Sequence, residues 1–153
     1  MSVLKQTATA FLFHDSRLLL VYHKKLQRWM HVGGHIEFGE TPSQALVREV
    51  REEVNLDFSF LEWYPIMDIL LIHRTVKQEP KPFLMHTRPT GESETLCYDF
   101  VCKVTDISQL QLAQSEITDY KWLTEQELRD DTTVSTYLRI LALNAFSVYK
   151  AAL

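Results

Sequence analysis

The residues of this 153-residue chain that could do chemistry together lie between Gly33 and Leu56. This stretch reads GGHIEFGETPSQALVREVREEVNL, with two glycines, an acidic turn and a run of helix-forming residues. Glu49, Glu52 and Glu53 stand three and four positions apart, so they fall on neighbouring sectors of one helix. Clustered carboxylate oxygens are what a hard cation such as Mg²⁺ binds, with water and phosphate oxygens completing its shell. A solvated acidic face is the alternative for three glutamates alone.

The segment that carries these glutamates is predicted to be a helix with defined ends. Thr41 is a good N-cap, Pro42 suits the first helical position, and Gln44 completes a capping box. Asn55 tolerates the left-handed conformation that ends many helices. At 100° per residue, one apolar stripe should face a core, and it consists of Leu46, Val47, Val50 and Val54.

The spacing of the glycines and charged residues resembles the Nudix box. That signature is a glycine, a glutamate six positions on, and then Arg-Glu-aliphatic-x-Glu-Glu-x-Gly-aliphatic. Here it runs from Gly34 through Glu40 to Arg48–Leu56, and every defined position matches except the last glycine, which is Asn55. Because asparagine adopts a positive φ at modest cost, this departure puts little in doubt.

The resemblance implies a hydrolase that acts on phosphorus-containing acid anhydrides. Nudix enzymes cleave the diphosphate linkage of a nucleoside diphosphate derivative, such as a nucleoside triphosphate or a nucleotide sugar, by attack of water at phosphorus. The resemblance also implies Mg²⁺ as the cofactor, with Mn²⁺ as a substitute. The expected metal ligands are the main-chain carbonyl of Gly33 and the carboxylates of Glu49, Glu52 and Glu53.

Around these ligands, the resemblance assigns supporting and catalytic roles. Arg48 would orient the glutamates through charge-assisted hydrogen bonds, and Glu40 would brace the loop, while Gly34 is a structural glycine of the motif. The catalytic residues are expected to be Arg48, Glu52, Glu53 and Glu116.

The identity of the general base stays open at the level of the sequence. Glu53 is one candidate, and Glu116 is another because it lies in a loop just before a short strand, where relatives often place a glutamate pointing at the metals. A solvated loop residue is the alternative for Glu116. Less favoured candidates are Glu92, Glu94 and Asp99.

Four residues are expected to bind substrate: Arg28, Trp29, His86 and Arg88. Arg28 belongs to a basic loop that could meet substrate phosphates, although a solvated loop would have the same composition. For Trp29, a core or loop anchor is favoured over a base-stacking residue, because a tryptophan buries a large apolar area. His86 and Arg88 fall in a proline-rich stretch, 73–95, that we predict to be a long loop, where specificity often resides. His73 and Arg74 are candidates in the same stretch, and ordinary surface polarity is the alternative for all four of its residues.

The rest of the chain predicts an α/β fold, a Nudix-like α/β/α sandwich with a central mixed β-sheet flanked by helices. The expected strands are a hairpin of 7–14 and 17–23, followed by 57–63, 66–73, 96–104 and 120–123. Thr124 opens a short helix with a capping box, and an apolar stripe predicts a C-terminal helix over 133–153. The members of that stripe are Val134, Tyr137, Leu138, Leu141, Ala145 and Tyr149.

Length and composition favour one domain spanning residues 1–153. A net charge of −4 gives no basic footprint for a stable nucleic-acid partner, and it means that an anionic substrate must be met by local cations. No apolar run approaches membrane-spanning length and no signal peptide is recognised, so we expect a cytoplasmic protein without a membrane partner. The sequence leaves open whether the chain forms a homodimer.

Two other functions are compatible with a Nudix-like fold. One is a non-catalytic Nudix domain that senses nucleotides, although such modules tend to lose the box glutamates that are all present here. The other is an isoprenoid diphosphate isomerase, which relies on a catalytic cysteine. Cys97 and Cys102 lie on one predicted strand at an odd separation, so they should point to opposite faces, stay reduced and lack a polarising neighbour.

Overall fold

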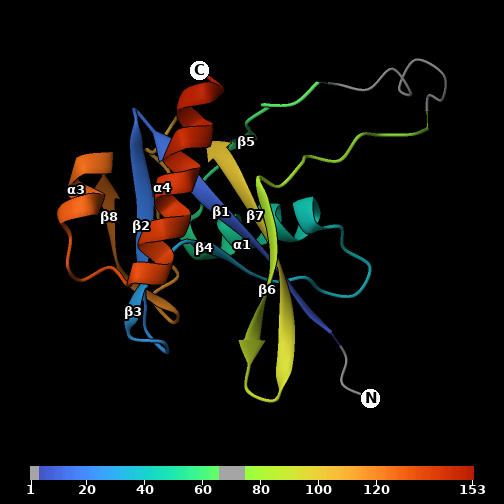
Figure 1. Cartoon of the computed structure of the whole chain (residues 1–153), viewed down its shortest axis with the longest axis horizontal. Coiled ribbons are helices and arrows are strands. Elements are labelled where there is room, and N and C mark those ends of the chain that lie inside the picture. Colours follow the sequence, from blue (N-terminus) through green and yellow to red (C-terminus); the bar gives the residue numbers. More distant parts are fainter. Residues whose placement is uncertain (1–3, 66–74) are drawn as a thin grey trace.

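The computed structural model describes residues 4–65 and 75–153. These residues form a single mixed sheet with helices on both of its faces (Figure 1). The strands are β1 (Lys5–His14), β2 (Arg17–His23), β3 (Arg28–Met30), β4 (Val32–His35), β5 (Ser59–Phe60), β6 (Leu84–Thr90), β7 (Ser93–Lys103) and β8 (Ile117–Leu123). The helices are α1 (Pro42–Val54), α3 (Glu125–Asp130) and α4 (Thr136–Ala151). The predicted α/β architecture with a central mixed sheet is confirmed.

The sheet is built around the parallel pairing of β1 with β7, which runs from Lys5 opposite Thr95 to Phe13 opposite Lys103. On its other edge, β1 pairs with β2 only near the turn at Asp15 and Ser16, and with β4 over its first half. Both turn residues have positive φ, of 45° and 61°, as a two-residue hairpin turn requires. The predicted hairpin is therefore confirmed, and β1 and β2 diverge where β4 enters.

Two apolar cores form because neighbouring residues of a strand point to opposite faces. On one face, Ala8, Ala10 and Leu12 pack with the buried side chains of α1, which lies behind β1 in Figure 1. On the other face, Phe11 and Phe13 pack under α4, which crosses in front of the sheet. Helices α1 and α4 therefore cover opposite faces of β1, whose sequence is apolar at consecutive positions and predicts burial on both faces.

Helix α1 begins and ends as its sequence predicts. Thr41 accepts a hydrogen bond from the main-chain N–H of Gln44, whose side chain accepts one from the N–H of Thr41 in return. Asn55 ends the helix in the left-handed region, with φ 53° and ψ 44°. The predicted apolar stripe is correct except at Val47, which is 47% exposed, because the buried face of α1 is displaced toward the side that carries Glu53.

Other boundaries differ from those predicted, chiefly where strands are short. The basic loop and the double glycine contain β3 and β4, and the expected strand 57–63 shrinks to β5. The expected loop 73–95 contains β6, which pairs with β7 alone among the described strands, so Pro89 removes no needed donor. The predicted strand 66–73 lies outside the described residues.

The later elements follow the prediction with small shifts. Strand β8 begins at Ile117 rather than at Tyr120, and β7 begins at Ser93 rather than at Leu96. Thr124 and Glu127 form the predicted capping box of α3. Helix α4 begins at Thr136 with Ser135 as its N-cap, and its predicted stripe is buried except at Tyr137, which is 51% exposed.

Both cysteines are buried and free. Cys102 packs in the α1-side core, whereas Cys97 lines a cavity on the opposite side of the sheet, so the expected opposite orientation is confirmed. Within the described residues, no helix is long and apolar enough to cross a membrane.

Phe13 offers a test of the α4-side core. Its ring stacks on Tyr149 with centroids 4.3 Å apart and meets Phe146 edge-on at 4.9 Å. We expect Phe13→Ala to lower the free energy of unfolding by about 3–5 kcal/mol, because it leaves a cavity in a packed aromatic cluster. Urea denaturation followed by circular dichroism measures this change. Phe38→Ala removes a fully exposed ring and serves as the control; equal losses in both variants would contradict this description of the core.

Candidate active site

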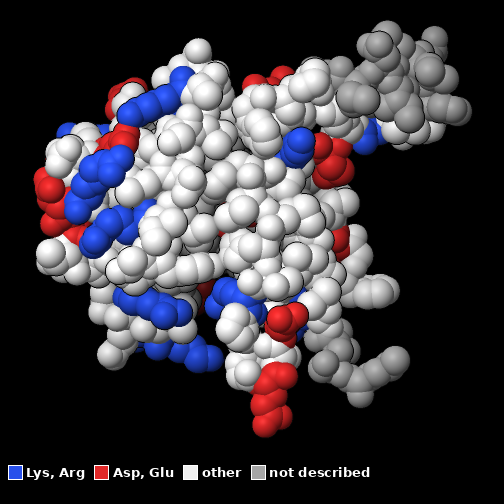
Figure 2. Space-filling view, viewed as in Figure 1, with Lys and Arg blue, Asp and Glu red and all other residues white. Residues whose placement is uncertain are grey.

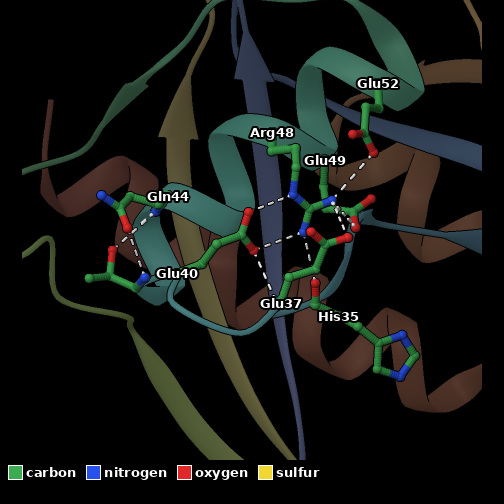
Figure 3. Close-up of polar contacts among 8 residues, drawn as sticks. His35, Glu37, Glu40, Gln44, Arg48, Glu49 and Glu52 are labelled. Carbon is green, nitrogen blue, oxygen red and sulfur yellow. Dashed lines mark hydrogen bonds and ion pairs between the residues drawn. The ribbon is translucent and has the colours of Figure 1, made fainter.

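Arg48 connects the loop before α1 to the acidic face of that helix (Figure 3). Its Nε and Nη2 donate to the two carboxylate oxygens of Glu40 at 2.7 and 2.9 Å, and Nη2 also donates to the main-chain oxygen of His35 at 3.0 Å. Its Nη1 donates to Glu49 at 2.9 Å and to Glu52 at 3.3 Å. A single guanidinium therefore holds three carboxylates and one carbonyl that come from two segments of the chain.

Glu40 is fixed from two sides by this arrangement. Besides the paired hydrogen bonds from Arg48, its carboxylate accepts the main-chain N–H of Glu37 at 2.9 Å. The hydrogen bonds from Arg48, and then that of Glu37, hold the pKa of Glu40 at about 2. The same contacts raise the pKa of Arg48, so the pair stays ionised and closes the acidic loop onto α1.

Glu53 is the buried member of the acidic group, with 4% of its surface exposed. Its Oε2 accepts the main-chain N–H of Gly33 at 3.2 Å. Burial raises the pKa of Glu53 to about 8, because the Gly33 N–H offsets the lost hydration only in part and the charges of Glu49, Glu116 and Glu52 oppose its ionisation. Burial also raises the pKa of Glu49, although Arg48 works against that shift.

The two glycines of β4 allow close contacts that a side chain would prevent. Gly33 has φ 148°, and a Cβ there would lie 2.3 Å from the main-chain oxygen of Ala8 in the adjacent strand. A Cβ on Gly34 would lie 2.4 Å from a carboxylate oxygen of Glu49. One glycine therefore lets β4 approach β1, and the other lets a glutamate of α1 lie directly over β4.

Glu116 lies in the loop that precedes β8, and this loop is attached to the end of α1. The main-chain N–H groups of Gln111 and Ala113 donate to the carbonyls of Val54 and Glu53, at 3.0 and 2.9 Å. The Glu116 carboxylate makes no hydrogen bond or ion pair with any described residue, yet its charge contributes to the raised pKa of both Glu49 and Glu53. The structure thus brings Glu116 into the neighbourhood of the acidic group.

The acidic group is not a preassembled metal site. Within residues 4–65 and 75–153, no three His, Cys, Asp or Glu side chains are arranged to hold an ion as they stand. In this arrangement Glu49 and Glu52 both accept hydrogen bonds from Nη1 of Arg48. The donors themselves suit a hard divalent cation, because all are oxygens and their mutual repulsion is the kind that such a charge relieves.

A cavity of about 600 Å³ opens beside this group, and Gly33, Gly34 and Glu53 are among the residues that line it. Three of the predicted substrate-binding residues also line it, namely Arg28, His86 and Arg88. Figure 2 shows Lys and Arg side chains on both sides of a hollow below the N-terminal end of α4. Positively charged side chains therefore lie at the cavity, although the net charge of the chain is −4.

The cavity is not lined by three other residues that the sequence suggested, Trp29, Glu92 and Glu94. Trp29 does not line the cavity; it packs edge-on against Tyr22 at 5.2 Å, with the Lys121 ammonium 3.9 Å from the centre of its ring. Successive residues of β3 alternate in direction, which is why Arg28 and Trp29 separate. Glu92 and Glu94 belong to the β6–β7 hairpin end and do not line the cavity, and His73 and Arg74 lie outside the described residues.

Sequence reasoning missed part of the cavity wall. His31, Tyr137 and Thr9 line it together with Asp99, which the sequence suggested only as a minor candidate for the base. Burial lowers the pKa of His31. The signal that could have found these residues is a polar side chain at an inward position of an otherwise apolar strand, as at Thr9 in β1 and Asp99 in β7.

The chain matches a known protein family and is similar in fold to solved structures. Residues 3–143 match the family model described as the NUDIX domain. A crystal structure of a NUDIX-family hydrolase from Clostridium perfringens is similar, with a TM-score of 0.79, 22% identity, and 94% of this chain and 97% of that chain covered.

Two further solved structures share the fold. A C. elegans Ap4A hydrolase binary complex has a TM-score of 0.69 at 19% identity, over 98% of this chain and 100% of that chain. A UDP-X diphosphatase has a TM-score of 0.67 at 18% identity, over 98% of this chain and 64% of that one. No functionally curated protein sequence matches the chain at a significant level.

The contact between Arg48 and Glu40 predicts a specific acid response. A carboxyl whose pKa is lower in the folded state stabilises the fold above its unfolded pKa of 4.5, and this contribution is lost as the pH falls toward about 2. We therefore expect Arg48→Met to return the pKa of Glu40 toward 4.5 and to reduce the loss of stability between pH 4.5 and 2.5. NMR titration and urea denaturation measure the two effects.

The control is Arg51→Met, which removes only an exposed ion pair with Asp57. This variant should leave the titration of Glu40 unchanged. An unaltered Glu40 pKa in Arg48→Met would show that the guanidinium does not hold that carboxylate.

Proposed function

The chain belongs to the Nudix family of hydrolases, and on that premise we propose that it is a Mg²⁺-dependent pyrophosphohydrolase. Its substrate would be a nucleoside diphosphate derivative, such as a nucleoside triphosphate or a nucleotide sugar, and water would attack phosphorus in the diphosphate linkage. The observation that carries this proposal is the crowding of Glu49, Glu52 and Glu116 around the buried carboxylate of Glu53, which lines a cavity that also has cationic residues in its wall.

The proposed metal ligands are three carboxylates of the Nudix box, Glu49, Glu52 and Glu53, and the main-chain carbonyl of Gly33, which directly precedes it. When bound, a divalent cation neutralises charge on the diphosphate oxygens and lowers the pKa of coordinated water. Arg48 supports this role because it already orients Glu49 and Glu52 through Nη1, and because Glu40 and the His35 carbonyl fix its other nitrogens. Arg28 and Arg88 would bind substrate phosphate oxygens by charge.

We propose Glu116 as the general base that accepts the proton of the attacking water. Glu53 is constrained by the hydrogen bond from Gly33, whereas the Glu116 carboxylate has no partner among the described residues and is free to meet a water molecule. The main-chain bonds of its loop to the end of α1 keep it beside the acidic group. A base needs such freedom to approach the proton that it takes.

The alternatives are less well supported. A nucleotide-sensing domain would not need the complete set of box glutamates that this chain retains. An isomerase would need a reactive thiolate. Cys97 does line the cavity and has His86 opposite it on β6, a neighbour that the sequence did not reveal, but its Sγ donates to the main-chain carbonyl of Thr95 at 3.7 Å. Burial raises the pKa of Cys102 well above its ordinary value.

Glu53→Gln tests the proposed function. This change keeps the size of the side chain but removes its charge. For any nucleotide that the wild-type protein hydrolyses, we therefore expect kcat to fall at least about a hundredfold and Mg²⁺ binding to weaken. Activity is measured by chromatography of the phosphorylated products formed from nucleoside triphosphates, nucleotide sugars and dinucleoside polyphosphates, with and without Mg²⁺, and metal affinity is measured by calorimetry. Glu62→Gln, at an exposed position, is the control. Unchanged turnover in Glu53→Gln, or turnover without any divalent ion, would contradict the proposal.

Glu116→Gln tests the base. We expect kcat to fall by about 10²–10⁴, with Mg²⁺ affinity largely retained and with partial recovery at high pH, where hydroxide replaces the assisted water. Pre-steady-state measurement of the hydrolytic step over a pH range gives these values. Glu92→Gln removes a carboxylate from the β6–β7 turn and is the matched control. If Glu116→Gln keeps the wild-type rate while Glu53→Gln loses it, the base is Glu53.

A further inference from the structure

Unpartnered buried polar atoms concentrate in one place in this protein. Among the described residues, the buried side-chain atoms without a hydrogen-bond partner include one from each of four residues that line the cavity beside Glu53. They are Thr7 Oγ1, His31 Nδ1, His86 Nδ1 and Asp99 Oδ2. Because an unmade hydrogen bond at a buried polar atom is costly, such a concentration indicates a surface built to meet a polar ligand.

The strand register places these groups on one face of the sheet. In the β1–β7 ladder, Thr9 lies opposite Asp99 and Thr7 opposite Cys97, and in the β6–β7 ladder, His86 lies opposite Cys97. Residues that lie opposite each other in a ladder point to the same face, and so do residues two apart in a strand. Farther along this face the residues become apolar and are covered by α4, so its polar part forms the floor of the cavity.

Asp99 is the central acceptor of this floor, with 1% of its surface exposed. Its Oδ1 accepts the hydroxyl of Thr9 at 2.5 Å. Its Oδ2 lies 3.4 Å from Nδ1 of His86, close enough for attraction but without an aligned hydrogen bond. The His86 ring is held from its other side, where Nε2 lies 2.7 Å from the hydroxyl of Tyr137. One oxygen of an oriented carboxylate thus remains available, and a carboxylate can only accept.

We propose that this cavity binds the base of the substrate and that Asp99 Oδ2 accepts its N–H groups. The base it selects carries two adjacent N–H donors, as the ring amide and amino group of guanine do, in preference to adenine. The hydroxyl of Thr7 is a second acceptor on the same floor. Adenine would instead turn the lone pair of a ring nitrogen toward the carboxylate, which is repulsive.

The walls and the volume suit a nucleotide with its base inward. Leu26, Met30 and Leu138 line the cavity as apolar surfaces for a flat ring, whereas a sugar alone would bury its hydroxyls against them. The carboxylate cluster at Glu53 lies at the same cavity, as do Arg28 and Arg88, which are cations for phosphate groups. The inference rests on the proposed function for the identity of the ligand as a nucleotide, and it adds which base is selected.

The direct test uses the wild-type chain and nucleoside monophosphates, which lack the diphosphate linkage and therefore report binding without turnover. In calorimetry, we expect GMP to bind about tenfold more tightly than IMP, which lacks the amino group, and at least about a hundredfold more tightly than AMP, since each hydrogen bond to a charged group has that order of effect. Equal affinities for GMP and AMP, or for GMP and ribose 5-phosphate, would overturn the proposal. So would the absence of GMP binding at millimolar concentration.

Asp99→Asn provides the second test, since it keeps the shape of the side chain and can still accept the Thr9 hydroxyl. We expect this variant to lose the preference for GMP over AMP, whereas Asp130→Asn, on the exposed side of α3, retains it. Thermal melting shows whether Asp99→Asn is folded; if it is not, the nucleotide series on the wild type decides alone. A retained preference in folded Asp99→Asn would overturn the assignment of Asp99.

The two proposals fail in different ways. Selective binding of GMP without hydrolysis of any guanine nucleotide would contradict the proposed enzymatic activity but support the proposed base pocket. Mg²⁺-dependent hydrolysis with no discrimination between guanine and adenine nucleotides would support the proposed enzymatic activity but contradict the proposed base pocket.

Discussion

The guanidinium of Arg48 is the contact on which the acidic site depends. Glutamates that stand three and four residues apart on a helix repel one another, and burial of Glu53 adds to that cost. Arg48 offsets it by bonding Glu49 and Glu52, and at the same time it fastens Glu40 and the loop that follows β4. One cation therefore sets both the spacing of the glutamates and the path of the chain toward Gly33.

On the face that α4 covers, the strands of the sheet carry an apolar core toward one end and a polar cavity floor toward the other. Toward one end of the face that α4 covers, Phe11 and Phe13 supply the packing that secures the helix. Toward the other end, Thr7, Thr9 and Asp99 replace apolar side chains and leave a cavity floor. Both ends belong to the same continuous ladder of β1 with β7, so one pair of strands carries the aromatic core and positions the polar groups.

Local signals in the sequence predicted what is locally determined. The capping residues Thr41 and Gln44, the end of α1 at Asn55 and the turn at Asp15 each act through neighbours in the chain, so their geometry could be foreseen. Strand β6 was not predicted because the prolines before it and within it resemble those of a loop, whereas its backbone pairs with residues of β7 that lie 3 to 15 positions away in the chain. The box residues were found by their spacing, whereas the grouping of Asp99 with His86 depends on strand register, which no single stretch encodes.

The attachment of the Glu116 loop to α1 has a mechanical consequence. The carbonyls of Glu53 and Val54, which the end of a helix normally leaves to water, are taken by N–H groups of that loop. These hydrogen bonds hold the two segments together. Because the carbonyl of Glu116 also accepts the main-chain N–H of Lys24 at 2.8 Å, the same loop ties the end of α1 to the sheet, so a shift of the helix relative to the sheet must strain the loop that carries Glu116.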